Sequence, residues 1–181
     1  MGRPAGKPCF TPDAGDHPMT DQPSITETRH LEADPEDVFR AWLDPELARL
    51  WLFVRSGRPA ERCEIDAREG GRFVILDRRE DGDAHFVGIY EEIDPPHRLI
   101  FRFATGRSAD IDPAEGGRVT VTVVPEKTGA SLTLVQDVPA AYAEYADRMR
   151  EGWKTLLAAL ASHLGVWVEK PDTKPFRGDI A

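Results

Sequence analysis

A single long amphipathic helix is the feature that most constrains how this chain can fold. Between Pro139 and Leu164, large apolar residues recur at steps of three and four, which places them on one stripe of a helix: Tyr142, Tyr145, Met149, Trp153, Leu156, Leu160 and Leu164. Pro139 suits a first helical turn, and Gly165 is a stop signal after the last periodic residue. The simplest interpretation of the stripe is core packing. The alternative is that its upper half also lines a ligand cavity.

The broad apolar partner that this stripe needs is predicted to be a β-sheet. A first strand covers residues 24–33, and Asp34-Pro35-Glu36 and Asp44-Pro45-Glu46 each open a short helix. Alternating apolar patterns then predict further strands at residues 62–67, 73–78, 84–93, 99–103, 119–123 and 132–136. Strands that follow one another through short turns form an antiparallel meander with one apolar face. The predicted fold is α+β, with a curved antiparallel sheet of about six to seven strands wrapped round the long C-terminal helix.

Length, charge and composition limit the domain organisation and the partners. A chain of 181 residues can form one domain with a sizeable core. We expect a disordered leader at residues 1–22, the domain at 23–166 and a tail at 167–181. The net charge of −9 argues against a nucleic-acid or anionic membrane surface. The N-terminus lacks the apolar segment of a signal peptide, which predicts a cytoplasmic protein.

The chain shows no known catalytic or metal-binding motif. It has no nucleophile elbow, phosphate loop or dinucleotide fingerprint, and its five histidines lack the spacing of metal ligands. Two cysteines make a disulfide framework unexpected, and Cys63 is interpreted as a small buried apolar residue. No cofactor, metal ion or catalytic residue is therefore assigned.

Polar residues at the ends of apolar strand faces are the candidates for contact with a ligand. Asp77 ends the face of Phe73, and Gln136 ends the face of Leu134. On the strand at 84–93 either face could point inward, which would bring in either His85 or Tyr90. The alternative for all of these residues is a strand end in water. Gly88, inside that strand, indicates a kink or a close backbone approach, which suits a sheet that curves round a helix.

Several motifs together resemble a known family. They are AWLDPELARLW ending at Trp51, DAREGGRF at 66–73, GIYEEIDPPHRLIF at 88–101, the valine strand with LTLVQ, and EGW-x3-L-x2-L in the helix. Over residues 24–165 the chain is similar to the family named for homologues of the activator of the heat-shock-protein-90 ATPase. That family lies in the START-like, SRPBCC or birch-pollen-allergen-like superfamily, and the resemblance implies a helix-grip fold with a cavity between sheet and helix. Leu52-Phe53-Val54-Arg55 replaces the aromatic and Gly-Pro pattern common after the second short helix, so the cavity entrance is expected to have its own shape.

The resemblance and the apolar strand faces lead to three functional hypotheses. The first is an intracellular module that binds a hydrophobic or aromatic small molecule, with the loop at 104–117 as a lid. The second is a cyclase or hydratase type of enzyme using the polar residues of the same cavity. The third is a chaperone-linked interaction protein. The residues that the family's eukaryotic co-chaperones use to contact the chaperone cannot be matched in this sequence. The sequence does not decide whether the protein forms a homodimer. The residues expected to line the cavity are Trp51, Phe73, Asp77, His85, Tyr90, Leu99, Phe101, Phe103, Val121, Leu134, Gln136, Met149 and Trp153.

Overall fold

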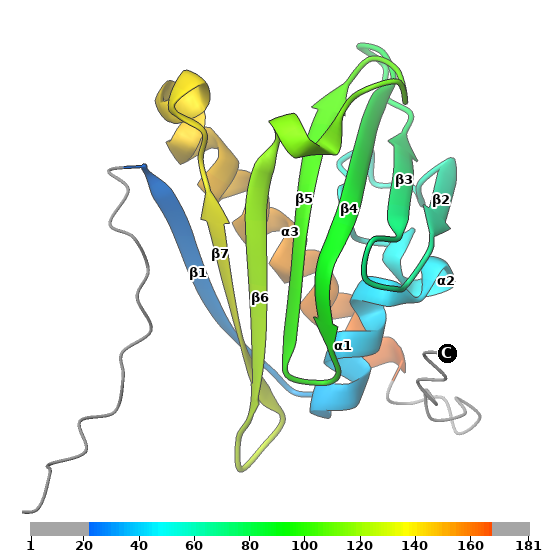
Figure 1. Ribbon diagram of the computed structural model, residues 1–181. Helices are drawn as coiled ribbons and strands as arrows, with labels where there is room; N and C mark the ends of the chain where they lie inside the picture. The colour runs from blue at the N-terminus through cyan, green and yellow to red at the C-terminus, as the bar shows by residue number, and fades with distance from the viewer. Residues whose placement is uncertain (1–21, 168–181) are drawn as a thin grey trace, which may run out of the picture.

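The computed structural model describes residues 22–167, so the predicted leader and tail lie almost wholly outside the described residues. Three α-helices, two 3-10 helices (η) and seven strands follow one another along the chain (Figure 1). Their bounds are β1 Ser24–Leu31, α1 Pro35–Leu43, α2 Pro45–Ala48, β2 Arg62–Ile65, β3 Arg72–Asp77, β4 Ala84–Asp94, β5 Arg98–Gly106, η1 Pro113–Glu115, β6 Gly117–Pro125, β7 Ala130–Asp137, η2 Ala140–Tyr145 and α3 Ala146–Trp167.

The seven strands form one antiparallel sheet in the order β1-β7-β6-β5-β4-β3-β2. Helix α3 crosses one face of the sheet, and α1 lies beside it at the lower end (Figure 1). This arrangement confirms the predicted α+β helix-grip fold. None of the helices within residues 22–167 is long and apolar enough to cross a membrane.

The long helix differs from its prediction at both ends. Residues 140–145 form η2, α3 begins only at Ala146, and it continues through Gly165 to Trp167. Tyr142 and Tyr145 are 48% and 44% exposed, so their assignment to a buried stripe was wrong. A 3-10 helix has three residues per turn, which puts these two rings on one side of η2. Tyr145 nevertheless faces a pocket together with Met149 and Trp153, in line with the alternative interpretation of the stripe. The fully buried part of the stripe begins at Trp153.

Strand β4 turns Phe86, Gly88 and Tyr90 toward α3. Gly88 pairs with Phe73 of β3, and a Cβ atom at Gly88 would lie 2.1 Å from a carbon of the Phe73 ring. The glycine therefore leaves room for the Phe73 side chain, whereas the sequence predicted a kink or a close backbone approach. A shift of register between Tyr90 and Glu92 brings Ile93 back to the core side of the strand.

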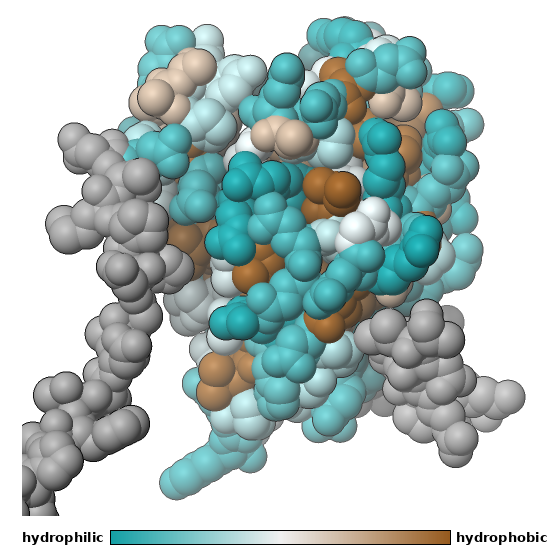
Figure 2. All heavy atoms as spheres, viewed as in Figure 1, coloured by the Kyte–Doolittle hydropathy of each residue, from teal (hydrophilic) through white to brown (hydrophobic). Residues whose placement is uncertain are grey.

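The other face of the sheet is mostly hydrophilic (Figure 2). Glu91 accepts hydrogen bonds from Arg102 at 2.7 Å and from Arg118 at 2.6 Å, which ties three neighbouring strands together on this face. The segment after β5 folds back so that η1 contacts β4 and β5. At the far edge, Cys63 is only partly buried against the core, and burial raises the pKa of its thiol to about 12.

Candidate ligand pocket

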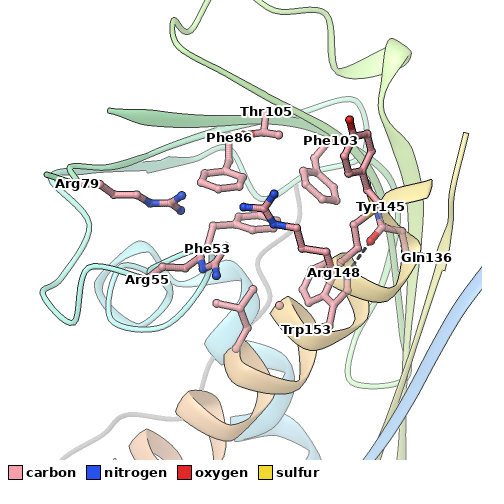
Figure 3. A pocket seen from close by; sticks show the side chains of 13 residues that line it. Phe53, Arg55, Arg79, Phe86, Phe103, Thr105, Gln136, Tyr145, Arg148 and Trp153 are labelled. Carbon is pink, nitrogen blue, oxygen red and sulfur yellow. Dashed lines mark hydrogen bonds between the residues drawn. The ribbon is translucent and has the colours of Figure 1, made fainter. Parts of the chain in front are cut away.

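A pocket of about 330 Å³ lies between the upper ends of β3, β4 and β5 and the first turns of α3 (Figure 3). Its walls come from the loop after α2, from the sheet and from the helix. The lining residues are Phe53, Arg55, Arg79, Phe86, Phe103, Thr105, Gln136, Tyr145, Arg148, Met149, Gly152, Trp153 and Leu156.

Phe53 is at the centre of the aromatic wall of the pocket. Its ring stacks on Phe86 with centroids 4.4 Å apart and planes 5° apart. The Phe53 centroid also lies 4.8 Å from that of Phe103 and 5.6 Å from that of Trp153. One side chain thus joins β4, β5 and α3 into a continuous apolar surface. Aromatic pairs at these separations stabilise one another beyond the area that they bury.

The backbone of Phe53 has an uncommon conformation. Its φ angle is 59°, in the left-handed region, and it is the only non-glycine residue among those described with a positive φ. A bulky side chain in this region costs of order 1–3 kcal/mol and persists only where surrounding contacts require it. Here those contacts are the three aromatic partners that line the pocket.

Trp153 and Gln136 connect the helix to the sheet at the inner end of the pocket. Trp153 Nε1 donates a hydrogen bond of 2.6 Å to Gln136 Oε1. The two residues are 3% and 4% exposed, so this hydrogen bond lies inside the protein. The bond fixes the orientation of the indole ring and therefore the shape of the pocket.

Asp77 lies behind the pocket and holds two of its basic residues in place. Its Oδ2 accepts a 2.6 Å hydrogen bond from Arg79 Nε and a 3.0 Å bond from the backbone N–H of Arg55. Burial of the carboxylate acts to raise its pKa. Hydrogen bonds from Arg79, Arg55 and Ser56 outweigh burial, so the pKa of Asp77 lies below its usual value. The Asp77 side chain is thus a charged anchor rather than a pocket wall.

Three arginines surround the pocket opening. The guanidinium of Arg79 lies over the Phe86 ring, 5.9 Å from its centroid, and its Nη2 atom is buried without a hydrogen-bond partner. Arg55 and Arg148 are exposed, and all three guanidinium groups point toward the pocket in Figure 3. No Asp or Glu of the described part of the chain lines the pocket. The opening is therefore electropositive in an otherwise acidic protein.

The predicted site residues fall into four groups. Phe103, Gln136, Met149 and Trp153 line the pocket, and Asp77 supports it from behind. His85 lies on the opposite face of β4 from Phe86. The remaining predicted residues are closed into the core rather than arranged round an open space: Trp51, Phe73, Tyr90, Leu99, Phe101, Val121 and Leu134. Burial also raises the pKa of the Tyr90 hydroxyl. Of the predicted lid at 104–117, Thr105 alone lines the pocket.

Several lining residues were not among the predicted site residues, although the resemblance placed the segment with Phe53 and Arg55 at the cavity entrance. Phe53 and Arg55 lie in an irregular loop, and Arg79 follows the end of a strand. Arg148 lies in the first turn of α3, where a charged residue is expected to face water. Within residues 22–167, no group of His, Cys, Asp and Glu side chains is arranged to hold a metal ion.

Comparison with known proteins identifies the family. The model of the family described as Activator of Hsp90 ATPase homolog 1-like protein matches residues 32–165. The chain belongs to this family. Its fold is of a kind that commonly binds hydrophobic ligands. A comparison with curated proteins found no match.

Solved structures of bacterial proteins share the fold. A Chromobacterium violaceum protein is 30% identical with a TM-score of 0.61, and the match covers 78% of this chain and 96% of that one. A Rhodobacter sphaeroides protein is 23% identical with a TM-score of 0.68, covering 83% and 96%. An Aeromonas hydrophila protein, described as AHSA1-like, is 21% identical with a TM-score of 0.68, covering 83% and 98%.

Proposed function

We propose that this protein binds a hydrophobic or aromatic small molecule in the pocket walled by Phe53, Phe86, Phe103 and Trp153. The volume of about 330 Å³ lies at the lower end of the range for small-molecule sites. Four aromatic rings from the loop, two strands and the helix face the same space. Such a surface favours an apolar ligand of modest size.

The main support for this proposal is the open space beside Gly152. It lies inside α3 and lines the pocket, and a Cβ atom built there meets nothing within 4 Å. Glycine within a helix costs roughly 0.5–1 kcal/mol relative to alanine. Neither helix geometry nor close packing requires glycine here, and the missing side chain leaves the helix side of the pocket open. Phe53, with its left-handed backbone, lines the same space, and local rules are broken together mainly at functional sites.

Binding is favoured over acid–base catalysis by the ionisable groups that face the pocket. These are Arg55, Arg79, Arg148 and Tyr145. Arginine stays protonated in proteins and is a poor general acid or base. The Asp77 carboxylate is already bonded to Arg79, and its lowered pKa makes it a weak base.

A fluorescence titration with the neutral apolar probe N-phenylnaphthylamine tests the proposal. We expect saturable binding to the wild-type chain with about one probe per chain. Gly152→Trp would fill the pocket from the helix side and should weaken binding at least tenfold. Gly165→Trp is the matched control, because Gly165 also lies in α3, is exposed and has open space at its Cβ position.

The interpretation of the titration requires that both variants stay folded. Circular dichroism and thermal unfolding of the two variants should match the wild type to within a few degrees. Absence of saturable binding to the wild type would refute the proposal. Equal binding by Gly152→Trp and Gly165→Trp would show that the probe binds elsewhere, and would refute it as well.

A further inference from the structure

We infer that the ligand carries an anionic group, and that this group is a carboxylate bound by the arginines at the pocket opening. The inference rests on the proposed function and adds the chemical class of the ligand. In this arrangement the apolar part of the molecule lies against Phe53, Phe86 and Phe103. Its carboxylate points outward to Arg55, Arg79 and Arg148.

The side chains of Arg55 and Arg148 are available to an anion. Neither guanidinium has an ion pair or a hydrogen bond with the residues that the structure describes, in contrast to most arginines of the domain. Arg102 and Arg118 share Glu91, for example, and Arg98 pairs with Glu92. Several arginines elsewhere on this protein are thus neutralised by acidic neighbours, whereas these two line an aromatic pocket and have no ion pair with a described residue.

Arg79 has donor capacity left after its bond to Asp77. Its Nε is used by the Asp77 carboxylate at 2.6 Å, but Nη2 is buried and has no partner. A buried donor without a partner carries a desolvation cost that a ligand oxygen could remove. Because Asp77 fixes the plane of the guanidinium, the free side of Arg79 is held in one orientation beside the ring of Phe86.

The local charge is opposite in sign to that of the whole protein. The chain carries a net charge of −9, yet the pocket lining contains three arginines and no acidic residue. Guanidinium groups match the planar geometry of a carboxylate and can bind it through two parallel hydrogen bonds. An amphipathic carboxylate with an aromatic body therefore satisfies both halves of the pocket.

Two competitors of the same shape test this inference. Naphthoate and naphthamide differ in having a carboxylate or a neutral carboxamide, and each can be titrated against bound N-phenylnaphthylamine at neutral pH. We expect naphthoate to displace the probe from the wild-type chain at a concentration at least tenfold lower than naphthamide does. The ratio of the two inhibition constants within one protein cancels any general effect of a substitution on folding.

The variant Arg55→Gln/Arg148→Gln should lower this ratio to within about threefold of one. Its control is Arg58→Gln/Lys154→Gln, which removes the same total charge from exposed residues that do not line the pocket. The control should keep the wild-type ratio. An equal fall of the ratio in both double variants, or no fall in the first, would overturn the inference.

The same titrations separate this inference from the function on which it rests. Binding of N-phenylnaphthylamine with equal displacement by naphthoate and naphthamide would leave the proposed function standing and refute the anionic ligand. Failure of the wild-type chain to bind the probe would refute both.

Discussion

The hydrogen bond from Trp153 Nε1 to Gln136 Oε1 joins the long helix to the sheet at the inner end of the pocket. Trp153→Phe removes the donor and leaves the Gln136 oxygen unpaired in a site only 4% exposed. An unpaired buried acceptor costs about 1–3 kcal/mol. The smaller ring adds a cavity term, so the expected total loss of unfolding free energy is about 2–4 kcal/mol. Gln136→Met, which leaves the indole N–H unpaired, should cost about 1–3 kcal/mol.

The double variant Trp153→Phe/Gln136→Met separates the hydrogen bond from the packing. With both partners apolar, neither position leaves an unpaired polar group, so the double variant should lose less than the two single losses added together. We expect a coupling free energy of about 1–3 kcal/mol. Urea unfolding followed by far-UV circular dichroism gives the free energies of all four proteins. Additivity within about 0.5 kcal/mol would refute a structural role for the bond.

Three further substitutions test other parts of the structure. Gly88→Ala should destabilise the protein by about 1–3 kcal/mol, because the new Cβ would overlap the Phe73 ring; an unchanged urea midpoint would contradict this packing. Gly152→Ala should raise the unfolding free energy by about 0.5–1 kcal/mol through helix propensity, and a loss of stability would show that the position is not open. The lowered pKa of Asp77 means that its carboxylate stabilises the fold above the unfolded-state pKa of about 3.9, and that this contribution is lost as the pH falls through the lowered folded-state pKa. Asp77→Asn should therefore flatten the acid side of the stability curve measured by urea midpoints, and an unaltered acid limb would contradict the pairing with Arg79.

The fold could be predicted because its signals are local. Alternation along each strand and the spacing of Trp153 and Leu160 on the helix depend only on nearby residues. Gly88 also gave a local signal, and the structure shows the ring that it accommodates. Local residues could not decide which face of β4 points toward α3. Val87 and Tyr90 lie on opposite faces of the strand, and both are buried.

The pocket was harder to predict because its walls meet only in the tertiary structure. The left-handed backbone conformation of Phe53 has no signal in the local sequence. Its ring is held by aromatic rings from three other elements. Arg79 follows the end of a strand, and Arg148 lies in the first turn of a helix. Charged residues at such positions normally face water. What distinguishes them is that both line a pocket beside aromatic rings from other elements, and a sequence pattern does not contain that information.

The position of the pocket follows from how unevenly the space between sheet and helix is filled. At the α1 end, Trp42 packs against Trp51 with centroids 4.7 Å apart and also lies 6.2 Å from Phe101 and 6.4 Å from Trp153. At the opposite end, the side chains that reach the opening include arginines. Burying a guanidinium without a partner is costly, so Arg55 and Arg148 keep their charged ends near water and do not close the core. The residues that keep the pocket open are thus the same ones that would bind a carboxylate, which is why replacing Arg55 and Arg148 together should alter ligand preference more than it alters stability.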